Sequence, residues 1–128
     1  MPYRLLAALA LLAASAPTAA EAPALGPKLK ARLQDRVAGE PVSCVPVSSR
    51  TRTSVLDRNA IIVWRGQETY YVNFPGCSTL REDRALIIDG DQKRVCEGDA
   101  MMVMNLETGI TYGSCEMGPF IPYARGKG

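Results

Sequence analysis

The residues best suited to chemistry in this chain are acidic side chains in its second half. Asp89, Asp91, Glu97 and Asp99 lie within eleven residues of one another. The Asp-Gly-Asp sequence at 89–91 could begin a calcium loop, because alternating oxygen ligands suit a hard cation. The spacing is not that of an EF-hand, and two basic residues interrupt the run. We therefore take Asp89, Asp91 and Asp99 as a candidate cation or partner contact. The alternative is that these residues only stabilise turns and hairpins.

A second candidate is basic. Arg50, Arg52 and Arg58 follow one another closely in the first half of the chain, and Arg65 comes next. Guanidinium groups pair well with carboxylates and phosphates. If the first three side chains converge, they could contact an anionic partner such as a cell-wall polymer, a lipid headgroup or an acidic protein. The alternative is that they mark solvated strand ends.

The chain of 128 residues contains no histidine. This excludes Ser-His-Asp and Cys-His catalysis, HExxH zinc sites and imidazole proton shuttles. The formal net charge of +2 does not indicate a nucleic-acid binder. We expect no enzyme, no cofactor and no metal. A hydrolase that uses carboxylates alone is the remaining catalytic alternative, with candidates Asp57, Asp89, Asp91, Glu97 and Asp99.

The first residues indicate export. Met1–Ala20 has an early arginine, an apolar run over Leu5–Ala14 and small residues after it, which is typical of a cleaved signal peptide. The run is far shorter than the ~20 residues that a membrane-spanning helix needs. We therefore expect a periplasmic or secreted protein with no transmembrane anchor in its mature form.

Four cysteines follow, and an even number in an exported chain predicts disulfides. They are widely separated, whereas a metal site needs close pairs such as CxxC. Three pairings are possible, and the spacing does not choose among them. The cysteines are Cys44, Cys77, Cys96 and Cys115.

The elements that would position these residues begin with a linker and one short helix over 21–41. Pro27 suits the first helical turn, and Leu29, Leu33 and Val37 share one helical face. The main feature is a β-hairpin of Ala60–Arg65 and Glu68–Phe74, with a two-residue turn that places Val63 opposite Tyr70.

Further strands are predicted around this hairpin. A second hairpin is predicted around 107–109, with Gly109 in the left-handed region of the turn. The tail 118–123 should lie along a sheet edge, because Pro119 and Pro122 have no backbone N–H to donate to a neighbouring strand. We expect residues 124–128 to form a flexible tail. The other predicted strands are 42–47, 53–56, 85–89, 100–106 and 110–115. The pattern predicts a mainly β domain over 42–123, a small antiparallel barrel or compact sandwich of six to seven short strands.

Five segments are RVAGEPVSCV (36–45), 57–63, TYYVN (69–73), VCEGD (95–99) and MGPFIPY (117–123). Together they resemble a family of small exported proteins of unknown function from sphingomonad-type alphaproteobacteria. In relatives with two cysteines, these lie at the positions that match Cys44 and Cys96. The resemblance thus implies the pairs Cys44–Cys96 and Cys77–Cys115, and it implies no activity.

We expect a non-enzymatic binding or structural module outside the cytosol. Its partner would be another envelope protein or a small ligand. The alternative is an inhibitor or partner-binding protein that acts on another exported protein through an apolar patch or an open sheet edge.

The cysteines give a first prediction. If the unreduced mature protein is denatured and treated with iodoacetamide, we expect no cysteine to be alkylated, because all four thiols are oxidised. Mass mapping after reduction should then find all four labelled. Alkylation of any cysteine before reduction would contradict the disulfide model.

Overall fold

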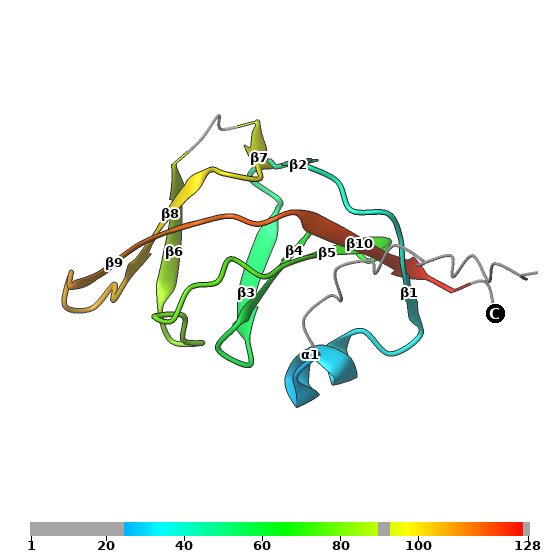
Figure 1. Cartoon of the computed structure of the whole chain (residues 1–128), viewed down its shortest axis with the longest axis horizontal. Coiled ribbons are helices and arrows are strands. Elements are labelled where there is room, and N and C mark those ends of the chain that lie inside the picture. The colour runs from blue at the N-terminus through cyan, green and yellow to red at the C-terminus, as the bar shows by residue number, and fades with distance from the viewer. Residues whose placement is uncertain (1–24, 90–92, 127–128) are drawn as a thin grey trace, which may run out of the picture.

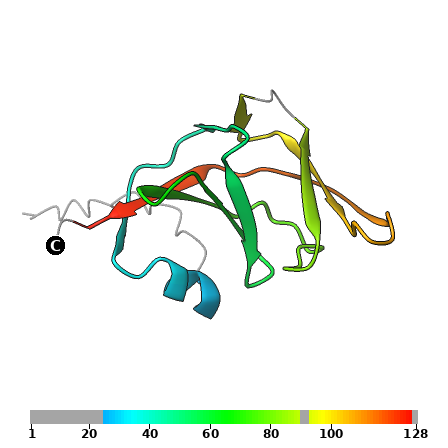
Figure 2. The same cartoon turned by 180° about the vertical axis from the view of Figure 1, so that it is seen from behind.

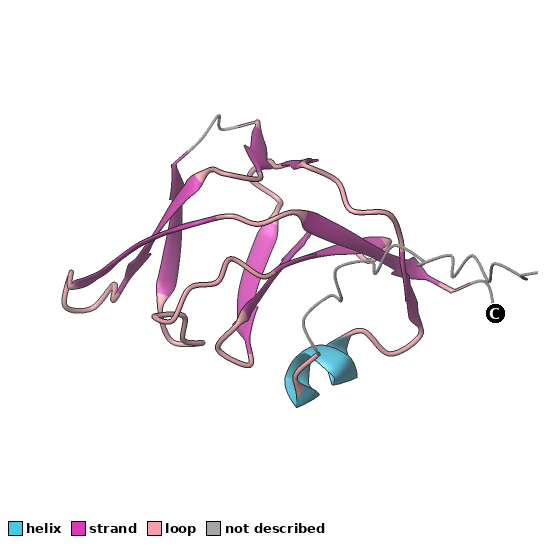
Figure 3. Cartoon of the chain, in the orientation of Figure 1, coloured by secondary structure: helices cyan, strands magenta, loops and turns pink. Residues whose placement is uncertain are grey.

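The structure is a computed structural model that describes residues 25–89 and 93–126. Within these residues it contains one short helix and ten strands (Figures 1 and 3). The helix α1 spans Pro27–Arg32. The strands are β1 (Arg36–Ala38), β2 (Cys44–Pro46), β3 (Arg52–Leu56), β4 (Ala60–Trp64), β5 (Thr69–Asn73), β6 (Ala85–Asp89), β7 (Arg94–Cys96), β8 (Ala100–Met104), β9 (Thr111–Glu116) and β10 (Phe120–Arg125).

Three antiparallel sheets arise from these strands. The largest has the strand order β1-β10-β5-β4-β3, a second has the order β6-β8-β9, and β2 pairs with β7. The mainly β class is confirmed. The described strands do not close into the predicted barrel, and their arrangement agrees with the compact sandwich. The ten described strands exceed the six to seven that were expected, and β1 and β7 match no predicted strand because such short strands carry little signal of their own.

The predicted central hairpin is present, but its register was wrong by one residue. Ile62 pairs with Val72 and Val63 with Tyr71, because four residues, 65–68, connect the strands instead of two. Gly66 has φ 70° in this connection. Since side chains alternate along a strand, the shift moves every β5 side chain to the face opposite the predicted one.

Both faces of the five-stranded sheet are covered. One face packs against the other two sheets in the main core, which includes Ile61, Val63 and Phe120. The opposite face packs Ile62 and Val72 against two leucines at α1. Figure 2 shows α1 below the five-stranded sheet, at the end away from β6, β8 and β9. The residues of β4 are therefore apolar on both sides, as a strand covered on both faces requires.

The helix is shorter than predicted. Leu29 and Leu33 are buried as expected, but α1 ends at Arg32 and Asp35 has φ 65° where the chain turns into β1. Val37 belongs to β1 and is 64% exposed, so the helical spacing that included it was misleading. No helix in the described part of the chain is long and apolar enough to cross a membrane.

Asp57 attaches this short helix to the sheet. It lies in the turn between β3 and β4, and its two carboxylate oxygens accept the backbone N–H groups of Lys28 (3.1 Å) and Leu29 (2.8 Å). A carboxylate is favourable there because the first N–H groups of a helix have no partner within it. Gly26 packs so closely that a Cβ atom would lie 2.4 Å from the Asp57 carboxyl carbon.

One long extended run, β9 followed by β10, crosses the molecule and belongs to two sheets (Figure 1). At the crossing, the side chain of Asn73 is fully buried. Its amide nitrogen donates to the Gly118 carbonyl (2.7 Å), and its oxygen accepts the Gly118 N–H (2.9 Å). These two bonds satisfy the backbone where the run leaves β8 and has not yet joined β5.

The expectation that this tail lies at a sheet edge was wrong, because β10 lies between β1 and β5. Pro122 is tolerated there for a local reason. In an antiparallel strand, the nitrogen and carbonyl of one residue point to the same neighbour. The Pro122 carbonyl accepts the N–H of Gly39 (2.7 Å), one residue beyond the end of β1. The missing N–H therefore faces the point where that ladder ends. The strand also continues to Arg125, past the predicted boundary at 123.

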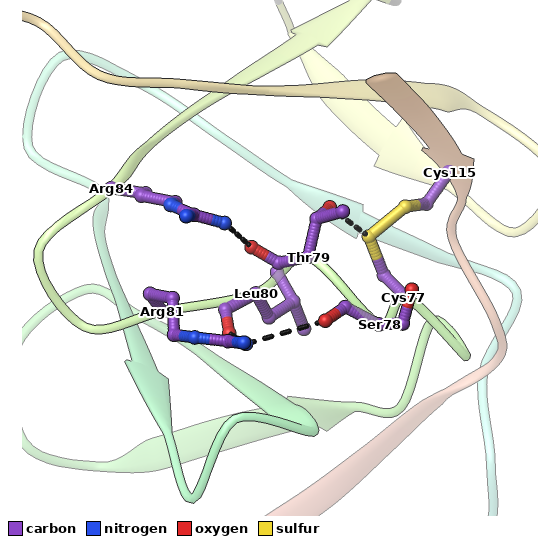
Figure 4. Close-up of a disulfide and its surroundings, with 7 residues drawn as sticks. All are labelled: Cys77, Ser78, Thr79, Leu80, Arg81, Arg84 and Cys115. Atoms are coloured by element: carbon purple, nitrogen blue, oxygen red, sulfur yellow. Dashed lines mark hydrogen bonds between the residues drawn. A yellow bond between two sulfur atoms is a disulfide. The ribbon is translucent and has the colours of Figure 1, made fainter. Parts of the chain in front are cut away.

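The structure contains two disulfides, with the pairing that the resemblance implied. Cys44 and Cys96 are direct neighbours across β2 and β7, with Cα atoms 4.0 Å apart. Cys77, in the connection after β5, is bonded to Cys115 of β9 (Figure 4). The bridges span 52 and 38 residues, so the chain-entropy model gives each about 4 kcal/mol of stability.

The loop beside the second disulfide is held by its own arginines (Figure 4). Arg84 donates to the Thr79 carbonyl (2.7 Å), and Arg81 donates to the carbonyls of Ser78 and Leu80. The Arg84 guanidinium also lies 3.5 Å from the ring centre of Tyr112. These contacts give the long connection between β5 and β6 a defined path over the core.

The clamp at the strand crossing gives a second prediction. Asn73→Leu should lower the free energy of unfolding by about 2–4 kcal/mol, since it leaves the N–H and carbonyl of Gly118 buried without partners. Urea unfolding measures the change. Asn59→Leu is the control, because that asparagine lies in an exposed turn. Equal effects of the two substitutions would show that the clamp contributes nothing.

The attachment of α1 gives a third prediction. Gly26→Ala should destabilise the protein by about 1–3 kcal/mol, because the new methyl group overlaps the Asp57 carboxylate. In an Asp57→Gly background the same change should cost less, since the overlapping atoms are gone. Urea unfolding of the four proteins forms a double-mutant cycle. Additive effects would contradict a direct contact.

Candidate functional site

Of the acidic candidates at 89, 91 and 99, the structure describes the side chain of Asp99 and the backbone position of Asp89. Asp99 accepts the backbone N–H of Cys96 (2.8 Å) in the turn between β7 and β8. Asp89 ends β6, where it is paired with Ala100. Asp91 lies outside the described residues. Among the side chains that the structure describes, 25–88 and 93–126, no three potential ligands from His, Cys, Asp and Glu lie close enough to hold a metal ion.

The three predicted arginines separate into two groups. Arg52 begins β3, where it pairs with Trp64, and Arg50 lies two residues before it. Arg58 lies in the turn at the other end of β3, with φ 60°. The strand therefore holds Arg50 and Arg52 at one end of the sheet and Arg58 at the other. The structure therefore does not bring all three side chains to one surface.

More arginines gather around the connection at 65–68, beside Arg50 and Arg52. They come from α1, β1, the connection itself and β10, segments that lie far apart in the sequence. We call this surface the arginine-rich end. It consists of Arg32, Arg36, Arg50, Arg52, Arg65 and Arg125. Two hollows lie at this end, and the acidic residues that line them in the described structure are Asp35 and Glu68.

Arg36 is the scaffold of this surface. Its guanidinium donates to the carbonyls of Gln67 (2.8 Å), Glu68 (3.0 Å) and Tyr123 (3.2 Å). It also lies 3.6 Å from the ring centre of Tyr70. One side chain thus ties the connection at 65–68 to β10 and β1. Because most of its donors are already used, Arg36 has little capacity for a ligand.

Arg32 and Arg125 have more capacity. The Arg32 guanidinium lies over the rings of Trp64 (4.9 Å) and Tyr70 (5.5 Å), and it makes no hydrogen bond or ion pair with any residue that the structure describes. Arg125 donates one bond, to the side-chain oxygen of Gln67 (2.9 Å). Both arginines line an open hollow together with Arg36. Their remaining N–H groups can bind a carboxylate or a phosphate.

Tyr70 lines this hollow, and Trp64 lies next to Tyr70 on the neighbouring strand. They are paired across β4 and β5, and their ring centres lie 6.0 Å apart. Cations are attracted to the faces of such rings. The aromatic pair therefore positions the guanidiniums of Arg32 and Arg36 without using their hydrogen-bond donors. The sequence showed a tryptophan and a tyrosine in a hairpin, but it did not show which cations would cover them.

A second hollow lies near the same connection, between β2 and the β4–β5 hairpin. We call it the cleft. Its volume is about 240 Å³. Its walls are mainly apolar, and its rim includes one arginine and one glutamate from the connection. Lining residues include Val45, Val47, Val63, Tyr71, Arg65 and Glu68.

Sequence reasoning found two of the six arginines as a contact and placed Arg65 beside them. It missed Arg32, Arg36 and Arg125. The first two lie in the segment interpreted as a short helix, and the third lies in the predicted flexible tail. No local motif marks these three. Their proximity depends on the pairing of β10 with both β1 and β5.

Comparison with known proteins places the chain in a family but gives no activity. No curated protein and no solved structure matches it significantly. One family model, described as a family of unknown function, matches residues 1–117, which is most of the chain. The protein therefore belongs to the DUF6491 family, whose function is unknown.

Proposed function

We propose that the protein is an exported, non-enzymatic module that binds an anionic partner at its arginine-rich end. Export is supported by the signal-like Met1–Ala20 segment and by two disulfides, which persist in oxidising compartments. The short mature chain would act in the periplasm or after secretion.

The concentration of charge carries the binding proposal. Six arginines and two carboxylates give this end an excess of four positive charges, whereas the whole chain has a formal charge of +2. Gathering like charges costs electrostatic free energy. Here the aromatic rings and backbone carbonyls that contact the guanidiniums offset this cost. These partners carry no net charge, so the positive field of the cluster still reaches solvent. A bound anion would be attracted by that field.

The carboxylates support a binding role over a catalytic one. Asp57 accepts two N–H groups at the start of α1, and Asp99 accepts the N–H of Cys96. Both are engaged in holding the backbone, where a hydrolase would need them aimed into a shared cleft. The inhibitor alternative remains within the proposal, since acidic side chains on another exported protein are anions of the same kind.

This proposal gives a fourth prediction. The mature protein should bind a short fluorescein-labelled poly-glutamate peptide at low salt, measured by fluorescence anisotropy. Arg32→Gln/Arg125→Gln should weaken binding by about tenfold or more, because two guanidinium contacts are lost. Added salt should reduce the affinity of the unmodified protein.

The control is Arg58→Gln/Arg94→Gln, which removes the same charge from two exposed arginines outside the arginine-rich end. It should retain most of the affinity. If both double variants weaken binding equally, total charge and not this surface would be responsible. No binding by the unmodified protein at low salt would reject the proposal.

A further inference from the structure

The cleft beside the arginine-rich end opens into the main core. Its deepest walls are Val45 of β2 and Val63 of β4, which are 2% and 1% exposed. Val47 and Tyr71 line it closer to the surface and are partly buried against the same core. A ligand there would exchange water for aliphatic side chains and one aromatic ring, which favours an apolar group.

The chain path keeps this cleft open. After β2 ends at Pro46, residues 48–51 form a tight turn in which the Thr51 hydroxyl accepts the Ser48 N–H (2.9 Å) and the Ser48 carbonyl accepts the Thr51 N–H (3.0 Å). The chain then enters β3, which pairs with β4 and not with β2. The two sheets therefore separate at this end, and the gap between them is bounded by fixed backbone.

The size of the cleft limits its occupant. An enclosed apolar cavity of about 150 Å³ is enough to bind benzene. The cleft has about 240 Å³, so it has room for one phenyl ring, or a branched alkyl group of that size, and a short connecting chain. It is smaller than the pockets of about 300–1,000 Å³ that hold drug-sized ligands.

The charge at the rim limits the occupant further. Arg65 and Glu68 line the cleft itself, and Arg50 joins them in the hollow directly outside. Two guanidiniums against one carboxylate leave the rim positive. An entering molecule with a negative group at its outer end would be favoured over a neutral or cationic one of the same shape.

We propose that the cleft binds a small carboxylic acid whose apolar part is a phenyl ring or a branched alkyl group of similar size. The apolar part lies between Val47 and Val63, and the carboxylate lies at Arg50 and Arg65. The proposal rests on the proposed function, because it assigns part of the arginine-rich end to a defined class of anion. It adds an apolar subsite that a simple polyanion does not use.

The test uses 3-phenylpropanoate and the neutral analogue 3-phenylpropan-1-ol, each titrated into the ¹⁵N-labelled full mature protein. We expect both to shift the amide resonances of residues 45–51 and 63–71, with the acid binding about fivefold more tightly. Val47→Trp should abolish both responses, because the indole fills the cleft. Arg50→Gln/Arg65→Gln should remove the preference for the acid and keep the response to the alcohol.

The arginine variant has exposed substitutions and should fold normally, so the test does not depend on the Val47→Trp protein. Arg58→Gln, at the opposite end of β3, is the matched control and should keep the full preference. Absence of shifts at 45–51 and 63–71 with either compound would overturn the proposal. Equal affinities for acid and alcohol, or acid shifts confined to residues 32–36 and 125, would also overturn it.

Failure here is distinguishable from failure of the proposed function. Val47→Trp should leave poly-glutamate binding unchanged, since the peptide needs the arginines and not the apolar walls. Poly-glutamate binding without any response to 3-phenylpropanoate would reject the cleft alone. A response to 3-phenylpropanoate without poly-glutamate binding would support the cleft and reject the broader polyanion role.

Discussion

The run from β9 to β10 serves as a strand in two sheets, and the register of the whole domain depends on how its crossing is held. Asn73 hydrogen-bonds to both backbone groups of Gly118 at the point where the run has no strand neighbour. A short distance before it, Cys115 is bonded to Cys77 in the connection that follows β5. A polar clamp and a covalent bond thus fix the same crossing. Because β10 pairs on both sides, any slip there would displace β1 and β5 together.

The same pairing creates the arginine-rich end. With β10 between β1 and β5, Arg36 and Arg125 lie beside the connection at 65–68, and both donate to Gln67. The pairing of Trp64 with Tyr70 across β4 and β5 places both rings beneath Arg32. The anion surface and the apolar cleft then share the 65–68 connection, so a ligand that contacts both would join a charged group to an apolar one.

Local signals predicted much of the fold. The strand Ala85–Asp89 has the predicted bounds, and Gly109 has φ 72° in the second hairpin, as its loop required. The errors have identifiable causes. The connection after β4 has four residues where its glycine suggested a two-residue turn. Pro122 suggested an edge strand, but its nitrogen points to the place where β1 has ended. In both cases the preference of the single residue was read correctly, but the pairing of the strands around it decided the structure.

The amino-acid sequence by itself determined most of the segments that extend into strands, the position of most turns, that the domain is mainly β, and which residue types were present for chemistry. These properties follow from side-chain shape and alternation over a few residues, which a short window contains. Tertiary structure decided which face of β5 meets the core and which arginines stand together. Such outcomes depend on the pairing of strands that lie far apart in the sequence, for example Arg36 with Arg125, and no local pattern encodes that pairing.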